Sequence, residues 1–304
     1  MEIYYEGAEI SQKIEVVELE VQDNCGDRLD AISLLCGDTQ GQWSGWGPKK
    51  GALLEVAQGG WRSGAMWIDL IRQEQGQLLL GAVSLPPQAK TLRSKSWEAV
   101  TLLTLAAEMA AAYGMPLQAY GVAAPACARV DQVNRGDLGF LRWRALLEGC
   151  AIKLAQGALV VYDCRYMERQ APAKAWTAAS FARPPRFSDS AGETYSACSL
   201  SWGGIQGYVQ AAGAIGPELT VTDQPVGSQG EAQRFAANLL WDKNKRAASA
   251  ELYLPLELGV AGGNVVAVSG CGLGDGRYFV ELARHDFVAK ESTFLCHRCG
   301  EAGG

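Results

Sequence analysis

The sequence predicts a mainly β protein of the α+β class. We expect two small antiparallel β-barrel-like domains, a helix-containing α/β domain between them, and a helix inserted in the second barrel. Short runs of alternating apolar and polar residues fill both ends of the chain, and helical periodicity marks the middle. The 36 glycines among 304 residues supply many tight turns. The expected domains are 1–90, 91–174 and 175–304, with the inserted helix at about 228–246.

The first β block covers residues 14–83. Residues 17–21 alternate between apolar residues and glutamate, which is the period of a half-buried strand. The next segment, Asn-Cys-Gly-Asp at 24–27, is typical of a turn. Glycine-containing turns separate further expected strands at 32–36, 52–57, 66–70 and 78–83. This spacing of short strands favours a small barrel or sandwich.

Helical patterns replace the strand patterns after residue 87. Residues 100–113 are rich in alanine and place apolar residues three and four apart on one stripe. A second helix is expected to start at Asp137, a good N-cap residue. A β-hairpin with strands at 151–155 and 158–163 follows it. These elements predict a small α/β unit between the two β blocks.

The second β block begins after an irregular, proline-containing segment at 167–191. Its one amphipathic segment is the expected helix at about 228–246. Strands are expected at 195–202, 208–212, 249–254, 265–269, 277–283 and 293–298. The order of a β block, an α/β insert and a second β block amounts to a coarse internal duplication at most.

Charge, apolar run length and the N-terminal sequence each argue against one class of protein. With 27 basic and 33 acidic residues the net charge is −6, which argues against a protein that binds nucleic acid by neutralising phosphates. No apolar run approaches the ~18 residues of a membrane helix. The N-terminus lacks the basic and apolar regions of a secretion signal, so the nine scattered cysteines are expected to be reduced thiols made in a cytoplasm.

Cys296 and Cys299 form the one CxxC motif of the chain. Such a pair can be half of a zinc, iron–sulfur or redox site, but about four ligands are needed and no second CxxC exists. The segment also has a strand pattern, in which residues three apart point to opposite faces. We therefore predict no metal-binding residue and keep a metal- or cluster-binding protein that uses Cys296 and Cys299 as an alternative.

His285 and His297 are the only imidazoles available to activate a cysteine nucleophile. No cysteine stands in a recognisable nucleophile motif. The glycine-rich segment 270–276 lacks the lysine of a phosphate-binding loop, so a wide turn is expected there. We predict no catalytic residue, no cofactor-binding residue and no cofactor, with an enzyme, either a cell-wall hydrolase or a thiol hydrolase, as an alternative.

Tryptophan is abundant, and several of the nine lie in glycine-rich loops. Loop tryptophans can anchor a protein–protein interface, or they can close the ends of the barrels. Both interpretations stay open for Trp43, Trp46, Trp61, Trp67 and Trp202.

Several short motifs follow one another in a specific order. The segment 93–98 has the pattern R-x-x-S-W before the first helix, and Asp-Leu-Gly-Phe-Leu at 137–141 starts the second. The others are 23–30 followed by 32–34 and 38–41, the P-x-x-G segment 48–51, then 157–162, 259–269, 276–280 and His285. In this order the chain resembles the phage late control D proteins, the baseplate hub family of contractile tails and tailocins.

Two positions depart from the family pattern. Gly136 replaces the usual acidic or polar residue before the second helix, and the final strand at 292–296 reads Ser-Thr-Phe-Leu-Cys. The resemblance covers about residues 14–298 and includes no LysM-like or lytic domain, so it implies a minimal hub.

The resemblance implies a mechanical role and no enzymatic activity. Family members carry two barrel domains of related fold and assemble as homotrimers, so that six similar units join a threefold spike to the sixfold tail tube. The implied partners are the central spike protein and the tail tube or tube-initiator protein, with the tape-measure protein and the baseplate wedge as further candidates. The implied location is the tail baseplate of a virion assembled in the host cytoplasm, with a mildly acidic lumen wall that avoids phosphate and with no membrane or sequence-specific nucleic-acid contact.

Overall fold

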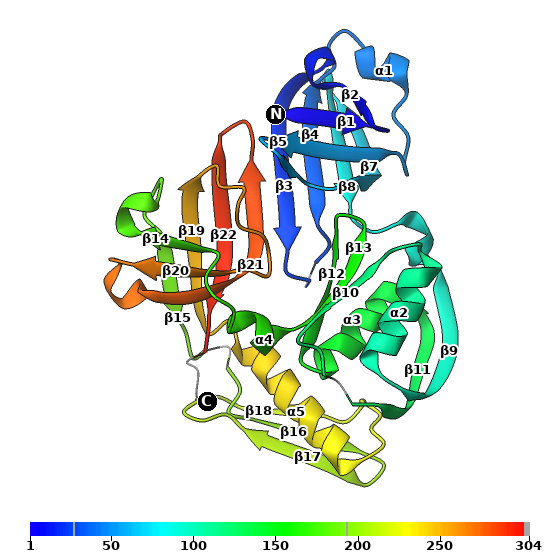
Figure 1. The fold of residues 1–304 in the computed structure, drawn as a ribbon, viewed down its shortest axis with the longest axis vertical. Coiled ribbons are helices and arrows are strands. Elements are labelled where there is room, and N and C mark those ends of the chain that lie inside the picture. The colour runs from blue at the N-terminus through cyan, green and yellow to red at the C-terminus, as the bar shows by residue number, and fades with distance from the viewer. Residues whose placement is uncertain (27, 124, 193, 301–304) are drawn as a thin grey trace.

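The computed structural model describes residues 1–26, 28–123, 125–192 and 194–300. Asp27, which belongs to the expected turn at 24–27, lies outside the described residues. The largest element is a sheet of 14 strands that takes its strands from both ends of the chain (Figure 1). The N-terminal strands are β1 (Glu2–Tyr5), β2 (Ala8–Glu9), β3 (Glu15–Asn24), β4 (Ala31–Gly37), β5 (Leu53–Gln58), β6 (Trp61–Arg62), β7 (Met66–Glu74) and β8 (Gln77–Val83).

The C-terminal strands complete the same sheet. They are β14 (Lys174–Thr177), β15 (Arg186–Asp189), β19 (Ala248–Pro255), β20 (Val265–Ser269), β21 (Gly276–Asp286) and β22 (Glu291–Arg298). The strand order is β15-β19-β22-β21-β3-β4-β8-β7-β5-β1-β2, with β6, β14 and β20 paired beside this path. Strands β21 and β3 are antiparallel, with Leu282 opposite Asn24 and Asp286 opposite Glu20. We call this pairing the seam.

The mainly β class with an α/β insert is confirmed. The path of strands is open at both ends, so the described residues form curved, barrel-like halves of one sheet and no closed barrel. Register shifts occur between β3 and β4, between β7 and β8 and between β21 and β22. Such β-bulges bend a strand and increase its twist, which explains how one sheet curls around two cores.

Each half of the sheet encloses a core of alternating apolar residues. Leu19, Ile32 and Leu80 are almost fully buried in the N-terminal core, and Leu252 and Phe294 are fully buried in the C-terminal core. The alternate residues of the same strands point to the other face of the sheet. The expected strands in the two β blocks therefore form, and two short ones, β14 and β15, also occur within the segment that was expected to be irregular.

The α/β insert consists of two helices, a three-stranded sheet and a two-stranded ribbon. Helix α2 (Leu102–Ala112) and helix α3 (Asp137–Leu147) lie where the periodicity predicts them. Strands β12 (Cys150–Ala155) and β13 (Ala158–Asp163) form the expected hairpin, and β10 (Leu117–Tyr120) adds to it in parallel. The ribbon of β9 (Leu92–Val100) and β11 (Cys127–Gly136) was not expected, and neither was β10.

Asp137 is not the N-cap of α3, because Gly136 occupies that position. The Asp137 carboxylate instead accepts hydrogen bonds from Tyr113 Oη at 2.7 Å and from Gln132 Nε2 at 2.8 Å. It is buried and lies 3.4 Å from Arg93 Nη1, so it joins α3 to α2 and to the ribbon. A helix-start signal in the sequence thus serves a tertiary contact.

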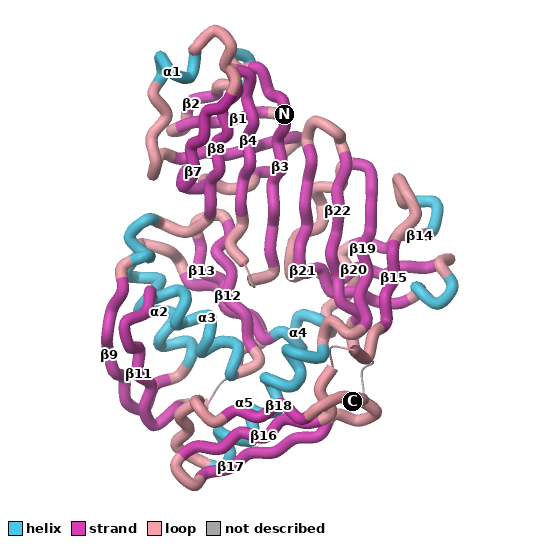
Figure 2. Tube along the Cα trace, turned by 180° about the vertical axis from the view of Figure 1, so that it is seen from behind, coloured by secondary structure: helices cyan, strands magenta, loops and turns pink. Residues whose placement is uncertain are grey.

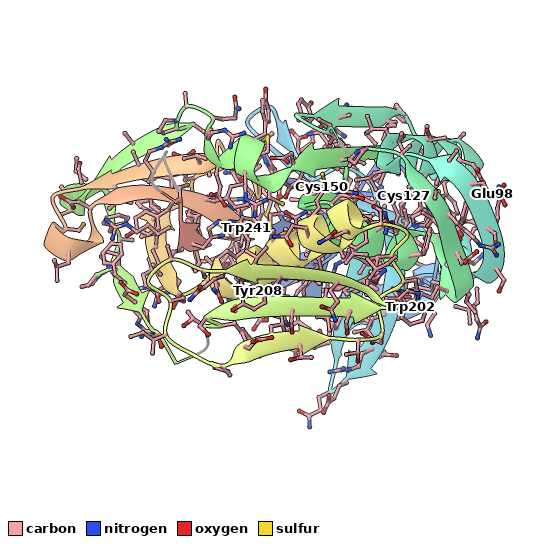
Figure 3. All side chains as sticks on the ribbon, turned by 90° about the horizontal axis from the view of Figure 1, so that it is seen from below. Glu98, Cys127, Cys150, Trp202, Tyr208 and Trp241 are labelled. Carbon is pink, nitrogen blue, oxygen red and sulfur yellow. The ribbon has the colours of Figure 1, made fainter. Side chains whose placement is uncertain are left out.

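A separate unit lies between β15 and β19 in the chain. It contains β16 (Ala197–Trp202), β17 (Ile205–Gln210), β18 (Glu218–Val221) and helix α5 (Gln229–Asn244). The expected helix is present, but the strands at 195–202 and 208–212 do not join the second β block. They form their own three-stranded sheet in the order β17-β16-β18, covered by α5 (Figure 3). This sheet forms separately because Phe235 and its neighbours on α5 bury Cys198 and Leu200 of β16.

Short helices complete the described chain. They are α1 (Gln42–Trp46), α4 (Cys164–Glu168) and the 3-10 turns Ser11–Lys13, Pro87–Lys90, Ala178–Ser180 and Gly272–Gly274. The last of these lies in the glycine-rich segment where a wide turn was expected. In the part of the chain that the structure describes, no helix has the length and apolar character needed to cross a membrane.

Candidate assembly surface

Eight neighbouring strands share one face that lies opposite the two cores, and we call it the open sheet face (Figure 2). Four of these strands, β15, β19, β22 and β21, come from the C-terminal half, and four, β3, β4, β8 and β7, come from the N-terminal half. The pairing registers place mainly polar and charged residues on this face. They include Glu18, Glu20, Gln22, Ser33, Arg72, Glu74, Arg186, Ser188, Glu251, Arg284, Glu291 and Thr293.

Ion pairs join neighbouring strands across this face. Arg284 Nε lies 3.7 Å from Glu20 Oε2 across the seam, and Arg186 Nη1 lies 3.6 Å from Glu251 Oε2. These side chains are partly exposed, so each pair contributes about 0–1 kcal/mol to stability. Carboxylates outnumber guanidinium groups among the residues named for the face, which gives it a mild negative charge.

Within the part of the chain that the structure describes, both outer strands of the eight-strand set have a free edge, β15 over its whole length and β7 over its second part. In the described residues, β7 from Asp69 onward pairs only with β8, and β15 pairs only with β19. An edge strand presents a row of free N–H and C=O groups that can pair with a strand of another chain. Leu70 on β7 is 41% exposed beside one such edge.

The edge of the smaller sheet is covered instead. The side-chain amide of Gln233 accepts a hydrogen bond from Tyr208 N at 3.0 Å and donates one to Tyr208 O at 2.7 Å, as a partner strand would. Asn244 does the same for Tyr195, at 2.8 Å to both backbone groups. Helix α5 therefore occupies backbone groups of this unit that could otherwise accept another strand.

The insert is fixed to the seam by the turn that follows β3. The ammonium group of Lys153 on β12 contacts the Asp23 carboxylate and donates to Gly262 O at 3.2 Å. Asp23 also accepts a hydrogen bond from Gly262 N at 3.0 Å. Gly26 has φ +123°, and a Cβ there would lie 2.4 Å from Ile152 O. Three parts of the chain thus meet at one turn, and only glycine permits the close approach at residue 26.

Asp30 is a buried carboxyl beside this contact. Its Oδ1 accepts a hydrogen bond from Asn24 N at 2.7 Å. Burial raises the pKa of Asp30 to about 7, although the nearby Lys153 ammonium opposes the rise.

A second buried polar cluster connects β22, β21 and α4. His297 Nε2 lies 2.8 Å from Glu168 Oε1, and Nδ1 lies 2.9 Å from Glu281 Oε1. Burial opposes protonation of His297, but the hydrogen bonds to Glu168 and Glu281 outweigh it and raise the pKa of the imidazole. Burial also opposes ionisation of Glu281, yet His297 and Arg246 lower its pKa to about 2. The imidazole thus lies between two carboxylates that favour its protonated form.

In the described part of the chain, both histidine rings hydrogen-bond to oxygen atoms. His285 Nδ1 lies 2.8 Å from Ser292 Oγ, and burial lowers the pKa of its ring to about 4. Burial raises the pKa of the Cys25 thiol to about 11 and that of Cys296 well above its usual value, so both favour the unreactive thiol. Within the described ranges, the histidine rings hydrogen-bond to Ser292, Glu168 and Glu281 and to no thiol.

The CxxC motif is divided between two environments. Cys296 is buried in β22 opposite Val280, whereas the half-buried Cys299 follows the strand and donates its backbone N–H to Arg277 O at 2.9 Å. Across residues 1–26, 28–123, 125–192 and 194–300, no group of three or more His, Cys, Asp or Glu side chains is placed to hold a metal ion.

The five tryptophans that were expected in loops lie in helix α1 and in strands β6, β7 and β16. Trp43 is buried in the N-terminal core, edge-on to Tyr5, and Trp61 packs edge-on to His285. Trp46 and Trp202 are 47% and 43% exposed, and Figure 3 shows Trp202 at one end of the smaller sheet. Trp67 lies on the open sheet face opposite Val83.

No protein-family model matches the chain, and no curated protein matches its sequence. Solved structures do match. The 43 kDa tail protein of prophage MuSo2 from Shewanella oneidensis superposes with a TM-score of 0.75 at 13% identity, over 98% of this chain and 97% of that one. A tail protein from Neisseria meningitidis MC58 gives a TM-score of 0.78 at 14% identity, over 98% and 95%.

This chain has the fold of phage tail proteins. A component of the type VI secretion system of Escherichia coli, described as similar to the T4 tail proteins gp27 and gp5, shares the fold with a TM-score of 0.60 at 10% identity, over 98% of this chain and 77% of that one. The expected tail-protein fold is therefore confirmed over nearly the whole length.

The sequence did not reveal the residues that shape this surface. Glu168 lies at the start of the proline-containing segment 167–191, which was expected to be irregular. Gln233 and Asn244 have the pattern of ordinary polar positions on a helix. For Gln233 and Asn244 the sequence does hold one signal. Their side-chain amides carry both a donor and an acceptor, so they can hydrogen-bond to the N–H and C=O groups of a strand edge.

Proposed function

We propose that the chain is a structural baseplate hub protein of a contractile tail or tailocin, forming a trimeric ring that joins the central spike to the sixfold tail tube. The observation that supports the proposal most is the division of the open sheet face. Each half of the chain contributes four of its eight strands. In the described residues, β15 has a free edge along its length and β7 has one from Asp69 onward. Three copies would supply six four-strand groups, which is the number that a sixfold tube requires.

The ring closes by strand pairing between copies. The free edge of β7 meets the free edge of β15 of the next copy, so each interface is heterologous and the rotation closes after three chains. The open sheet face then lines the lumen, and its excess of carboxylates repels the phosphates of passing DNA. The N-terminal and C-terminal halves alternate around the ring.

The proposed partners are the central spike protein and the tail tube or tube-initiator protein, with the tape-measure protein and the baseplate wedge as further neighbours. The proposed location is the tail baseplate of a virion assembled in the host cytoplasm. The role requires no catalysis, cofactor, membrane or sequence-specific nucleic acid. Neighbours of known structure that are tail proteins support this proposal.

Light scattering of the purified protein, alone and with the spike protein, tests the trimer. We expect three copies of the 32.5 kDa chain per particle. Leu70→Lys places a charge beside the β7 edge and should raise the concentration for half-assembly about tenfold, which corresponds to ~1.4 kcal/mol. Tyr208→Lys, at the edge that Gln233 covers, is the matched control and should leave assembly unchanged. A monomer under all conditions would refute the proposal.

A further inference from the structure

A groove of about 770 Å³ lies at one end of the open sheet face, where the sheet approaches helices α3 and α5. Four arginines from different parts of the chain line it, and we call it the arginine groove. They are Arg28 after β3, Arg142 on α3, Arg186 on β15 and Arg246 after α5. Leu282 of β21 and Leu295 of β22 give it an apolar floor.

The groove runs across the strands rather than along them. Its lining includes residues from β3, β21, β22, β19 and β15, which are consecutive in the sheet. Five strands with a spacing of about 4.8 Å cover ~19 Å, the length of about six extended residues. Arg28 and Arg142 lie at the β3 end and Arg186 at the β15 end, so positive charge is spread over the whole length.

The charge of the groove opposes that of the chain, which is −6 overall. Two carboxylates, those of Glu251 and Glu281, also line it. Glu251 faces Arg186 at 3.6 Å, and Glu281 is held by His297 and Arg246. Among the described residues, neither Arg28 nor Arg142 has a carboxylate within ion-pair distance. The groove therefore retains a positive charge that an acidic ligand would neutralise.

We propose that the arginine groove binds an extended acidic peptide segment of a partner protein. Guanidinium groups bind carboxylates through paired N–H donors, and the leucine floor accepts the aliphatic side chains between them. A nucleic acid fits less well, because its continuous phosphates would meet Glu251 and Glu281 inside the groove and Glu20 and Glu291 on the face beyond it. The identification of the partner as a tail component rests on the proposed function, whereas the binding chemistry does not.

Fluorescence anisotropy of the full chain tests the proposal. The probe is a short labelled peptide of alternating glutamate and leucine, and the control probe has glutamine for glutamate. We expect only the acidic probe to bind, with an affinity that falls as salt rises. The double variant Arg28→Gln/Arg142→Gln should weaken binding about tenfold. The matched control Arg72→Gln/Arg135→Gln removes two exposed arginines outside the groove and should bind as the wild type does.

Four results would overturn the inference: no binding of the acidic probe, equal binding of both probes, no effect of the groove variant, or tighter binding of an oligothymidylate that the groove variant abolishes. Light scattering of the same samples separates this inference from the proposed function. A trimer that does not bind the acidic probe contradicts the groove alone, and a monomer that binds it contradicts the hub alone.

Discussion

Arg284 on β21 and Glu20 on β3 form an ion pair across the seam, with Nε and Oε2 3.7 Å apart. The two residues come from opposite ends of the chain. In the antiparallel register of the two strands, Arg284 lies opposite Gln22 and His285 lies opposite Val21. The two β halves are therefore parts of one hydrogen-bonded sheet, and their relative orientation is fixed by backbone pairing rather than by a flexible linker.

Gly207 to alanine should loosen helix α5 from the sheet beneath it. A Cβ at Gly207 would lie 2.3 Å from the backbone carbon of Ala232 on α5, so the helix must shift. We expect a loss of about 2 kcal/mol in the free energy of unfolding, measured by urea denaturation. Gly139→Ala is the control, because α3 has open space there, and it should gain about 0.5–1 kcal/mol. Equal effects of the two variants would contradict this packing.

Glu148 to glutamine should destabilise the contact between α3 and α5. The buried Glu148 carboxylate lies 3.2 Å from Arg144 Nη2 and 2.7 Å from Arg234 Nε. Without its charge, the buried Arg144 loses its compensation, and we expect a cost of about 3 kcal/mol in a thermal or urea unfolding experiment. Glu108→Gln removes the exposed partner of Lys95 and should cost less than about 1 kcal/mol. A smaller effect at Glu148 than at Glu108 would be inconsistent with this role.

Asp30 to asparagine should flatten the pH dependence of stability between about pH 4 and pH 7. Burial raises the pKa of Asp30 to about 7 in the folded chain, so the folded state holds a proton that the unfolded state releases. Stability from this group is therefore lost as the pH rises through that range. Asparagine keeps the oxygen that accepts from Asn24 N and has no charge to bury. Urea midpoints across the range measure the slope, and an unchanged slope would refute the assignment.

His297→Gln should make the free energy of unfolding independent of pH in the range where the wild type loses stability as the pH rises. Glu168 and Glu281 outweigh burial and raise the pKa of His297, so the folded state binds its proton more tightly than the unfolded state. The contribution is complete below about pH 6.5 and is lost as the pH rises through the folded pKa. We expect the wild type to lose stability over that interval and His297→Gln to be less stable but flat. Histidine NMR titration provides an independent measurement of the same pKa.

Much of the local structure follows from the sequence. The alternation at 17–21 predicts β3, the apolar stripe at 100–113 predicts α2, and the turn at 156–157 predicts the β12–β13 hairpin. In each case neighbouring residues carry the signal, because burial of one face repeats with the period of the element. The ordered motifs also point to the tail-protein fold that the structure has.

The assembly of these elements was less predictable. The β9–β11 ribbon is largely exposed, so it lacks a buried alternating face to reveal it. Strands β16 and β17 have an ordinary strand pattern, which does not specify the sheet they join. The seam depends on pairing between β3 and β21, and no local pattern encodes a partner so distant in sequence.

The sequence predicted that the chain assembles with partners, but not which residues form the candidate surface. Its two free edges arise because, in the described residues, β7 from Asp69 onward pairs only with β8, and β15 pairs only with β19. Both are properties of the topology. Its arginine groove collects side chains from four separate segments. Neither feature leaves a motif in a single stretch of sequence.

The seam joins strands that are translated at very different times. During translation β3 emerges from the ribosome early, whereas β21 and β22 emerge more than 250 residues later. Until then the edge of β3 that pairs with β21 has no partner strand, and the sheet of the nascent polypeptide is incomplete. The eight-strand set can be completed only after β22 has been translated, so the open sheet face exists only in a nearly finished polypeptide.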